Sequence, residues 1–497
     1  MNITIENFLL VGSLLLLISI IAGKASFRFG IPTLILFLVI GMLAGSDGIL
    51  GIQFDNPRIA QFIGIVSLNF ILFSGGMDTD WGTIKPVFWQ GFSLSTLGVL
   101  LTAVTLGVFV WWITDFSLYE GLLLGAIVSS TDAAAVFSIL RSRSLALKSN
   151  LRPTLEFESG SNDPMAYVLT IAFLSLVTNP SAGLGSVILM FFWQMIIGAM
   201  AGYVFGRISK HIINKIQLDA EGLYPVLAIA LMFITFSATD FVGGNGFLAV
   251  YLCALYLGNQ VLMHKKALIK AFDGFAWLMQ IILFLVLGLL VFPSQVWPLA
   301  GVGLLISAFL IFVARPVSVF LSLMFFKMKL RRRFYISWVG LKGAVPIVFA
   351  TYPLIAGIDK AGIIFNIVFF VSLTSLVLQG TSLGIVAKWL HVALPQKVRR
   401  QSAVEAFLTD SGKSSMVEIY VPEGSHPVKK KVVDLLFPKS SIIALIRRDG
   451  GFITPNGNTV IEANDTMIVL SNNEEGMRDV YKSLRLENPL VGSSQEI

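Results

Sequence analysis

Runs of apolar residues close to twenty long recur through the first 390 residues of this 497-residue chain. An α-helix needs about 20 such residues to cross a hydrocarbon core of ~30 Å. Every backbone polar group inside that core must be paired within the protein, so the runs predict a bundle of membrane-spanning helices. Only 13% of the residues are charged, about half of the usual share. We therefore expect an all-α polytopic membrane protein in a lipid bilayer.

Thirteen apolar segments can be distinguished, and the loops between them indicate the topology. The loops after odd-numbered segments contain eighteen Lys and Arg residues, whereas the loops after even-numbered segments contain two. Because basic loops remain in the cytoplasm, this split predicts an external N-terminus and a cytoplasmic C-terminus. The segments cover residues 7–23, 29–46, 58–77, 86–113, 119–140, 153–178, 184–206, 222–241, 243–262, 273–292, 298–326, 334–357 and 361–390.

The character of the chain changes after Pro395. Short alternating runs separated by turn signals predict strands over 416–421, 441–447, 459–462 and 466–470, and a helix over 477–484. From His391 onward there are 13 Lys and Arg and 13 Asp and Glu, so the net charge of +7 belongs to the membrane part and does not indicate a nucleic-acid partner. We expect a membrane domain over 1–392, a linker over 393–402, a small cytosolic α+β domain over 403–486 and a tail over 487–497.

Ionisable residues are rare inside the predicted membrane segments. Each costs ~2.5–3.5 kcal/mol at the centre of a spanning helix, so each is a candidate functional residue. Four of the six fall within 32 residues on segments five and six. The six are Asp132, Glu156, Glu158, Asp163, Arg315 and Lys342.

Segment six contains the most suggestive of these groups. Pro164 removes a backbone donor and disfavours α geometry at Asp163, so the helix is expected to be interrupted there. Ser159, Asn162 and Asp163 share one helix face. Hydroxyl, amide and carboxylate oxygens suit a hard monovalent cation such as Na⁺ or K⁺. Asp163 is therefore the first candidate for a cation ligand.

Two other segments are polar at mid-membrane. Segment five carries Ser129–Asp132 amid apolar sequence, and segment twelve carries Leu341–Pro346, in which Gly and Pro flank a cation. With segment six, this predicts three interrupted helices beside ionisable groups. Such helices are typical of secondary transporters.

Several of these residues also have a structural interpretation. Asp132 can cap a neighbouring helix, and Arg315 can extend towards the cytoplasmic helix end. Glu158 is better explained as an ion-pair partner of Lys342 or Arg315, since a paired carboxylate stays ionised and does not readily cycle protons. For Asp163 the functional interpretation is favoured, because it precedes a proline and has hydroxyl and amide neighbours but no nearby cation in sequence.

Together the motifs resemble the monovalent cation:proton antiporter family, in its Na⁺/H⁺-exchanger-like (NhaP) branch. The resemblance covers roughly residues 1–390 and rests on Ser-Thr-Asp at 130–132, Glu-Ser-x-x-Asn-Asp-Pro at 158–164 and Gly-Leu-Lys-Gly-Ala at 340–344. The strand pattern Asn464–Leu470 is similar to the TrkA C-terminal (RCK-C) ligand-binding domain. The combination resembles bacterial potassium/proton antiporters of the cytoplasmic (inner) membrane.

This resemblance implies a fold and a site. The fold would be a homodimer of thirteen-helix chains with an inverted repeat, in which two interrupted helices cross at mid-membrane and one bundle moves like an elevator. A K⁺ (or Na⁺) ion and a proton would compete for Asp163, with Ser159 and Thr131 as ligands, Asp132 at the crossing and Asn162 orienting the site. Glu158 would pair with Lys342, and Ser130, the first residue of the Ser-Thr-Asp motif, is a candidate pathway or selectivity residue.

Two departures from the family pattern, and one position that differs between branches of the family, bear on the expected function. Lys342 stands where Arg is usual, and lysine is a point charge that cannot hold a carboxylate bidentately. Ser74, near the end of segment three and a candidate pathway or selectivity residue together with Arg315, stands where many sodium-handling relatives have an acidic residue. The missing carboxylate favours K⁺, which is easier to dehydrate, over Na⁺. Asn162 stands where electrogenic relatives have Asp, which favours an electroneutral 1:1 exchange.

The sequence thus predicts a transporter, not an enzyme, that exchanges cytoplasmic K⁺ for external protons without a cofactor. Sodium is the alternative cation. A ligand-gated channel would need a backbone-carbonyl filter of TVGYG type, which the chain lacks. A membrane-anchored sensor does not explain the buried carboxylates. The cytosolic domain is expected to regulate transport through a small nucleotide, a cyclic dinucleotide being one candidate; the alternative is a passive module that stabilises a dimer.

Overall fold

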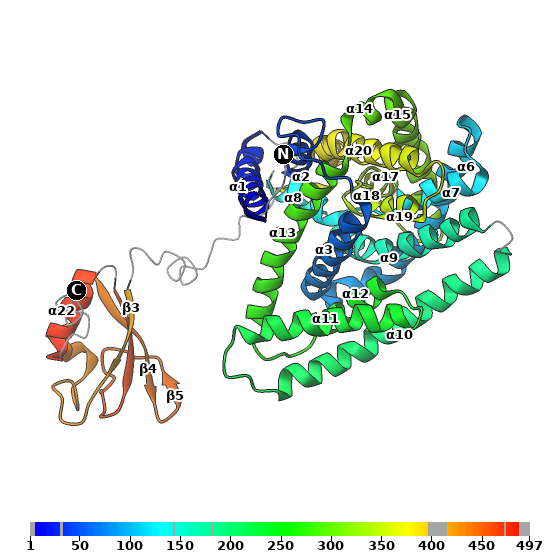
Figure 1. The fold of residues 1–497 in the computed structure, drawn as a ribbon. Coiled ribbons are helices and arrows are strands. Elements are labelled where there is room, and N and C mark those ends of the chain that lie inside the picture. The colour runs from blue at the N-terminus through cyan, green and yellow to red at the C-terminus, as the bar shows by residue number, and fades with distance from the viewer. Residues whose placement is uncertain are drawn as a thin grey trace. The chain divides into compact units, whose positions relative to one another are not determined.

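The computed structural model describes residues 5–29, 33–142, 145–148, 150–179, 183–395, 415–471 and 474–486. The chain divides into two units, Met1–Gln396 and Lys397–Ile497. The first unit is helical and the second contains a sheet (Figure 1). The predicted linker and tail lie largely outside the described residues.

The elements of the first unit are α1 (Ile5–Phe29), α2 (Thr33–Ala44), α3 (Pro57–Asp78), α4 (Trp81–Ile84), η1 (Lys85–Val87), α5 (Phe88–Ser93), η2 (Leu94–Gly98), α6 (Val99–Ile113), α7 (Leu118–Ile127), α8 (Ala133–Ser142), β1 (Leu145–Leu147), α9 (Leu151–Thr178), α10 (Leu184–Lys215), α11 (Leu223–Phe241), α12 (Gly246–Gly258), α13 (Lys265–Leu290), α14 (Pro293–Val296), η3 (Trp297–Leu299), α15 (Ala300–Phe309), η4 (Leu310–Ala314), α16 (Arg315–Ser322), α17 (Leu330–Trp338), α18 (Val345–Phe349), α19 (Thr351–Ala356), α20 (Ala361–Trp389) and β2 (Ala393–Pro395).

Seven helical stretches within the described residues are long and apolar enough to cross a membrane. Five shorter apolar helices accompany them. The mostly helical, membrane-spanning character predicted from the sequence is therefore confirmed, and the count of thirteen spans stays a prediction. The long stretches are Pro57–Asp78, Trp81–Ile113, Gly185–Lys215, Leu223–Phe241, Lys265–Leu290, Pro293–Ser322 and Ala361–Trp389.

The expected interruption of segment six is wrong. One helix, α9, runs unbroken from Leu151 to Thr178 with Pro164 inside it. A proline removes one backbone donor, and a spanning helix tolerates that loss when neighbouring groups pair the backbone. The carbonyl that Pro164 leaves without its helical donor is that of Gly160, whereas the carbonyl of Pro164 itself accepts a further hydrogen bond from Asn245 Nδ2 at 2.8 Å.

Segments five and twelve are interrupted, as predicted. Between α7 and α8 the chain is non-helical over Val128–Asp132, and between α17 and α18 it is non-helical over Val339–Ala344. Each break follows, in chain order, a helix that contains a π-helical turn, η2 before the first and η4 before the second. The two π-bearing helices pack together, since Ser318 Oγ donates to the Gly98 carbonyl and Ser93 Oγ to the Ser322 carbonyl, both at 2.8 Å.

Helix α12 is the centre of a second, smaller hydrophobic core. It packs on α3, α10 and α11, and Figure 1 shows α10 and α11 side by side along one edge of the unit. Val250, Cys253, Ala254 and Leu257 of α12 belong to this core, which also draws on α3, α10, α11 and α13. Helix α9 instead packs mainly on α5, η2 and α7, so two helix groups meet where α9 faces α12.

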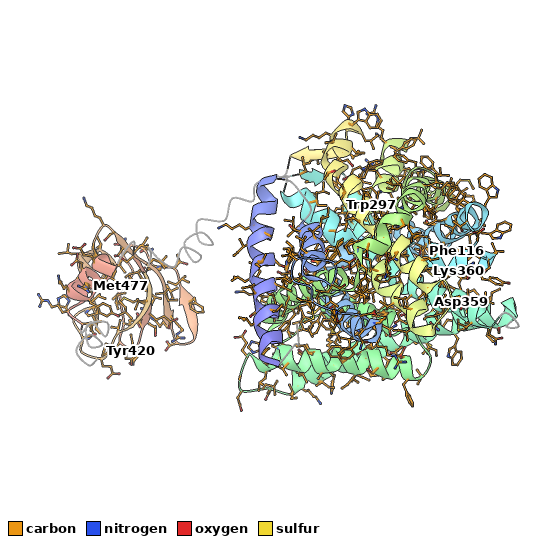
Figure 2. All side chains as sticks on the ribbon, turned by 45° about the horizontal axis from the view of Figure 1, so that its top comes forward. Phe116, Trp297, Asp359, Lys360, Tyr420 and Met477 are labelled. Carbon is orange, nitrogen blue, oxygen red and sulfur yellow. The ribbon has the colours of Figure 1, made fainter. Side chains whose placement is uncertain are left out.

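A surface contact joins the start of α7 to the loop before α20. Lys360 Nζ donates to the Asp115 carbonyl at 2.5 Å, lies 3.2 Å from Glu120 Oε2 and sits 5.3 Å from the centroid of the Phe116 ring. Phe116 and Lys360 are labelled close together in Figure 2. Glu120 also closes a capping box with Ser117. The contact therefore holds the start of α7 next to the start of α20.

Within its described residues, the second unit is a four-stranded antiparallel sheet with one α-helix. Its elements are β3 (Ser415–Tyr420), η5 (Val432–Leu435), β4 (Ser441–Arg448), β5 (Gly451–Ile453), β6 (Thr466–Ser471) and α22 (Glu474–Leu484), in the strand order β3-β6-β4-β5. Met477 of α22 is buried in the domain core, whereas Tyr420 at the end of β3 is 55% exposed (Figure 2). The strand predicted over 459–462 is wrong, since only an isolated bridge at Val460 forms there.

Candidate functional site

The two helix breaks cross each other and are joined through the backbone. The amide of Asp132 donates to the carbonyl of Leu341 at 2.8 Å. Gly343 lies so close to the Asp132 side chain that a Cβ at this position would overlap it. A glycine is therefore required for the two extended segments to approach this closely.

Lys342 holds the crossing from the second break. Its side chain is 1% exposed, and Nζ donates to the carbonyls of Ser130 at 2.8 Å and Ser129 at 3.2 Å. These carbonyls follow the C-terminal end of α7, where unpaired carbonyls give a helix a partial negative charge. The ammonium group is thus placed where it compensates that end of the broken helix.

The expected pairing of Glu158 with Lys342 differs from the structure. Glu158 forms a buried ion pair with Arg315 of α16, and the two side chains are 1% and 2% exposed. Lys342 already donates to the two carbonyls of the first break, and the longer Arg315 side chain reaches Glu158 from the facing helix. Arg315 therefore does not extend to a helix end.

Asp132 begins the second half of the interrupted helix. Its Oδ1 accepts from the backbone amide of Ala135 at 3.0 Å, which is the geometry of an N-cap on α8. The capping function considered from the sequence is thus present, on the helix that Asp132 itself starts. A carboxylate at a helix N-terminus is also favoured by the helix dipole.

Three residues of the predicted site tie α9 to the first break. Ser159 Oγ donates to the Thr131 carbonyl at 2.7 Å, and Asn162 Nδ2 donates to the Thr131 hydroxyl at 2.5 Å. Asn162 is fully buried. Asp163 follows on the same face, and its Oδ1 is enclosed without a hydrogen-bond partner among the described residues. The polar groups around the Asp163 carboxylate include Ser130, Asp132 and Lys342.

A cavity of about 540 Å³ opens onto this carboxylate. Asp132, Ser159 and Asp163 line it at the crossing. Much of the remaining wall comes from the C-terminal end of α3 and the N-terminal end of α9. The polar lining residues at those two ends are Asp78, Thr79, Asp80, Thr83, Arg152 and Glu156.

The cavity wall differs in part from the residues that the sequence singled out. Ser74 is buried and is not among the lining residues, while its neighbours Ile71 and Gly75 are. Gln280 and Tyr251 line the cavity and had no sequence signal, since each lies in an apolar run.

Both units of the chain match known families. Residues 13–389 match the family described as sodium/hydrogen exchanger, transmembrane, and residues 416–485 match the TrkA-C domain. The chain is 40% identical over 470 residues to the K⁺/H⁺ antiporter NhaP of Alkalimonas amylolytica, covering 94% of this chain and 81% of the relative. It is 39% identical, with the same coverage, to the K⁺/H⁺ antiporter NhaP2 of Shewanella sp. strain ANA-3.

A solved structure has a similar fold. The sodium proton antiporter MjNhaP1 from Methanocaldococcus jannaschii, at pH 8, superimposes with a TM-score of 0.68 at 25% identity. The alignment covers 78% of this chain and 99% of that chain.

Proposed function

The chain belongs to the sodium/hydrogen exchanger family, and from this membership we propose that it exchanges cytoplasmic K⁺ for external protons across a bacterial cytoplasmic membrane. Cation/proton antiport follows from the family. Potassium is supported by relatives of about 40% identity that are named for K⁺. The observation that carries the proposal is the Asp163 carboxylate, which is enclosed at the crossing. Among the described residues, its Oδ1 atom has no hydrogen-bond partner.

The exchange rests on competition for one carboxylate. An empty Asp163 would be a bare charge in a low-dielectric site, so the site crosses readily only with a proton or a cation bound. Ser159 and Asn162 both donate to Thr131, which fixes the oxygens around Asp163. Asn162 is neutral, so one cation is exchanged for one proton and no net charge moves.

Two charges at the site are proposed to stay constant during the cycle. Lys342 donates to backbone carbonyls of the first break and stabilises that break whether or not a cation is bound. Glu158 is neutralised by Arg315 and so is not a second exchangeable carboxylate. With Asp132 proposed to serve as the N-cap of α8, this leaves Asp163 as the group whose occupancy changes.

The cavity supports an orientation for this state. Much of its wall comes from the end of α3 and the start of α9, helix ends that the predicted topology places on the cytoplasmic side. On the other side of Asp163, Tyr167 packs edge-on against Phe247 with ring centroids 5.2 Å apart and against Tyr352 at 5.7 Å. We interpret the arrangement as open to the cytoplasm and closed to the outside.

Alternating access would then move the helices around α9, which carries Asp163, against α12 and the helices of its core, α3, α10, α11 and α13. We call these five helices the α12 group. Such an elevator movement would occur at the surface where α9 faces α10 and α12. The matched order of a π-bearing helix and then a broken helix, found twice in the chain, supports an inverted repeat and a span count of thirteen. A homodimer is proposed from the family, with the α12 group as its fixed part.

The TrkA-C domain is proposed to regulate the exchange. Domains of this kind can bind a nucleotide, and a small regulatory nucleotide is the expected ligand. Removing residues 400–497 should abolish the response of exchange to that ligand. Exchange that keeps the same pH and ligand dependence after the deletion would leave the domain a passive module.

Sodium is the second candidate cation, because the similar solved structure is that of a sodium proton antiporter. The test is cation-induced proton movement in proteoliposomes, with K⁺ and Na⁺ added separately across a range of pH. Proton movement with K⁺ and little with Na⁺ is expected. Movement with Na⁺ alone would replace the cation while keeping the mechanism, and no movement with either cation in the ligand-supplied protein would contradict antiport.

A further inference from the structure

Tyr251 of α12 stands in the wall of the cavity, and nothing in the exchange described above uses its hydroxyl. The side chain is 1% exposed, and its ring lies directly on the backbone of α9 at Gly160. A Cβ on Gly160 would come within 2.5 to 2.6 Å of three atoms at the phenol end of the ring. Glycine at this position therefore makes room for the ring next to the helix that carries Asp163.

The Tyr251 hydroxyl is buried without a hydrogen bond among the described residues. Its polar neighbours are the hydroxyls of Thr79, at the end of α3, and Ser161 of α9. Interactions with these two hydroxyls do not reach the geometry of a normal hydrogen bond, and a buried hydroxyl gains from a better partner, so its place on the cavity wall points to an occupant of the cavity.

Thr79 presents a second oxygen to the same space. Its hydroxyl donates to the Gly75 carbonyl at 2.7 Å, so the proton is used and the remaining lone pair of the oxygen is available as an acceptor. Thr79 and Tyr251 both line the cavity. The same cavity is lined by the carboxylates of Asp78 and Asp80, next to Thr79 in sequence, and by Asp163 on α9.

We propose that the hydroxyl oxygens of Tyr251 and Thr79 form an intermediate binding site for the monovalent cation, occupied on the way from the cytoplasm to Asp163. The proposal rests on the proposed antiport and adds a cation site to it. Neutral oxygens replace part of the hydration shell of K⁺ without binding it as strongly as a carboxylate does. A site on a conduction path must be of this kind, because the ion has to leave it again.

The site would act on one side of the membrane. Tyr251 belongs to the α12 group and Asp163 to the moving group, so the two are adjacent only when the cavity faces the cytoplasm. The hydroxyl should therefore affect the loading of cytoplasmic K⁺ and not its release or rebinding on the outside. It should also leave the pH dependence of exchange unchanged, because the proton binds at Asp163.

The test compares Tyr251→Phe and Thr79→Val with a matched control, Tyr256→Phe. Tyr256 lies on the same helix and packs against Tyr203, with ring centroids 5.7 Å apart, and it does not line the cavity. Potassium-dependent proton movement is measured in everted vesicles, which expose the cytoplasmic face, and in right-side-out vesicles. The pH profile and the maximal rate are recorded for each variant.

Tyr251→Phe and Thr79→Val should raise the apparent KM for cytoplasmic K⁺ about three- to tenfold, roughly the net contribution of one ordinary hydrogen bond, because the lost contact is to a site that holds the ion only weakly. The maximal rate, the pH profile and the KM for external K⁺ should stay within about twofold of wild type, as should every parameter of Tyr256→Phe. An unchanged KM in both variants would show that the hydroxyls bind only water. An equal rise from both faces would place Tyr251 in the main site, and either result would overturn the proposal. Failure of antiport itself is detected separately, as absence of exchange in wild type.

Discussion

The side-chain amide of Asn245 donates a 2.8 Å hydrogen bond to the carbonyl of Pro164, the residue that follows Asp163. Asn245 is fully buried, its Oδ1 caps α12 by accepting from the Leu248 amide at 3.0 Å, and its own backbone amide donates to the Gln194 carbonyl of α10 at 3.0 Å. One residue therefore links the α12 group to the helix that carries the exchangeable carboxylate.

Asn245→Ser separates these two functions. Serine is as good an N-cap as asparagine but lacks the amide that donates to Pro164. We expect the melting temperature to change little, and the apparent KM for cytoplasmic K⁺ to rise about fivefold, since the inward-facing state loses a hydrogen bond of ~1 kcal/mol. Asn245→Ala removes the cap as well and should lower the melting temperature. Wild-type KM in Asn245→Ser would show that the bond to Pro164 has no part in the cycle.

The buried pair of Glu158 and Arg315 should be needed for stability more than for proton exchange. Glu158→Gln leaves the Arg315 charge buried without a counter-ion, a change that costs about 3–5 kcal/mol. The melting temperature in detergent should fall markedly, and the double variant Glu158→Gln, Arg315→Met should recover most of the loss. The control is Arg152→Ala, which breaks a pair with Glu156 in which Arg152 is 62% exposed and should cost less than ~1 kcal/mol. An equal fall in melting temperature in Glu158→Gln and Arg152→Ala would contradict this structural function of the pair.

Gly343→Ala should abolish exchange, because a Cβ at this position overlaps the Asp132 side chain at the crossing. Gly362→Ala is the matched control: among the described residues, no atom beyond its own helix backbone and chain neighbours lies within 4 Å of the position that its Cβ would take. Proton movement driven by K⁺ is measured for both variants at equal protein amounts in the membrane. Full exchange in Gly343→Ala would mean that the two breaks do not cross as closely as described.

In the cytosolic domain, Asp465 is paired with Arg448, whose Nε and Nη2 donate to its two carboxylate oxygens at 2.8 Å. Burial tends to raise the pKa of Asp465, but the hydrogen bonds from Arg448 and from the Glu462 amide outweigh it, so the pKa lies below its usual value. A carboxylate with a lowered pKa stabilises the fold above its unfolded pKa of about 3.9, and that contribution is lost as the pH falls through the folded value.

Asp465→Asn should therefore destabilise this domain by about 1–2 kcal/mol at pH 7. The measurement is hydrogen exchange of residues 415–471 in the full-length protein, corrected for intrinsic rates. The difference from wild type should begin to shrink below about pH 4, where the unfolded chain binds the proton, and should vanish only when the pH falls below the lowered pKa of folded Asp465. Asp479→Asn, at an exposed pair with Lys482, serves as the control. A difference that persists unchanged at low pH would show that the pairing is not electrostatic.

The polar motifs, together with the family resemblance that rests on them, predicted which segments come together. Thr131, Ser159 and Asn162 are joined by hydrogen bonds in the structure because the only way to bury such groups in a membrane is to pair them. The helix breaks at Ser129–Asp132 and 341–346 followed from the same reasoning, since both carry polar or helix-weakening residues in apolar surroundings.

Partners across helices could not be predicted in this way. Lys342 and Arg315 are both cations within predicted membrane segments, and which of them pairs with Glu158 depends on the carbonyls that the first break exposes to Lys342. Pro164 indicated an interrupted helix, but α9 continues through it, and that tolerance depends on the surrounding helices and not on the local sequence. Tyr251 could not be singled out from the sequence, because only the folded structure shows that it lines the cavity.

The central claim is that a cation and a proton compete for Asp163. The most direct measurement is proton release from purified protein in weakly buffered detergent solution when K⁺ is added, for wild type and Asp163→Asn at matched folding. Wild type should release close to one proton per chain at saturating K⁺, and Asp163→Asn should release none. Undiminished proton release from Asp163→Asn would contradict the account.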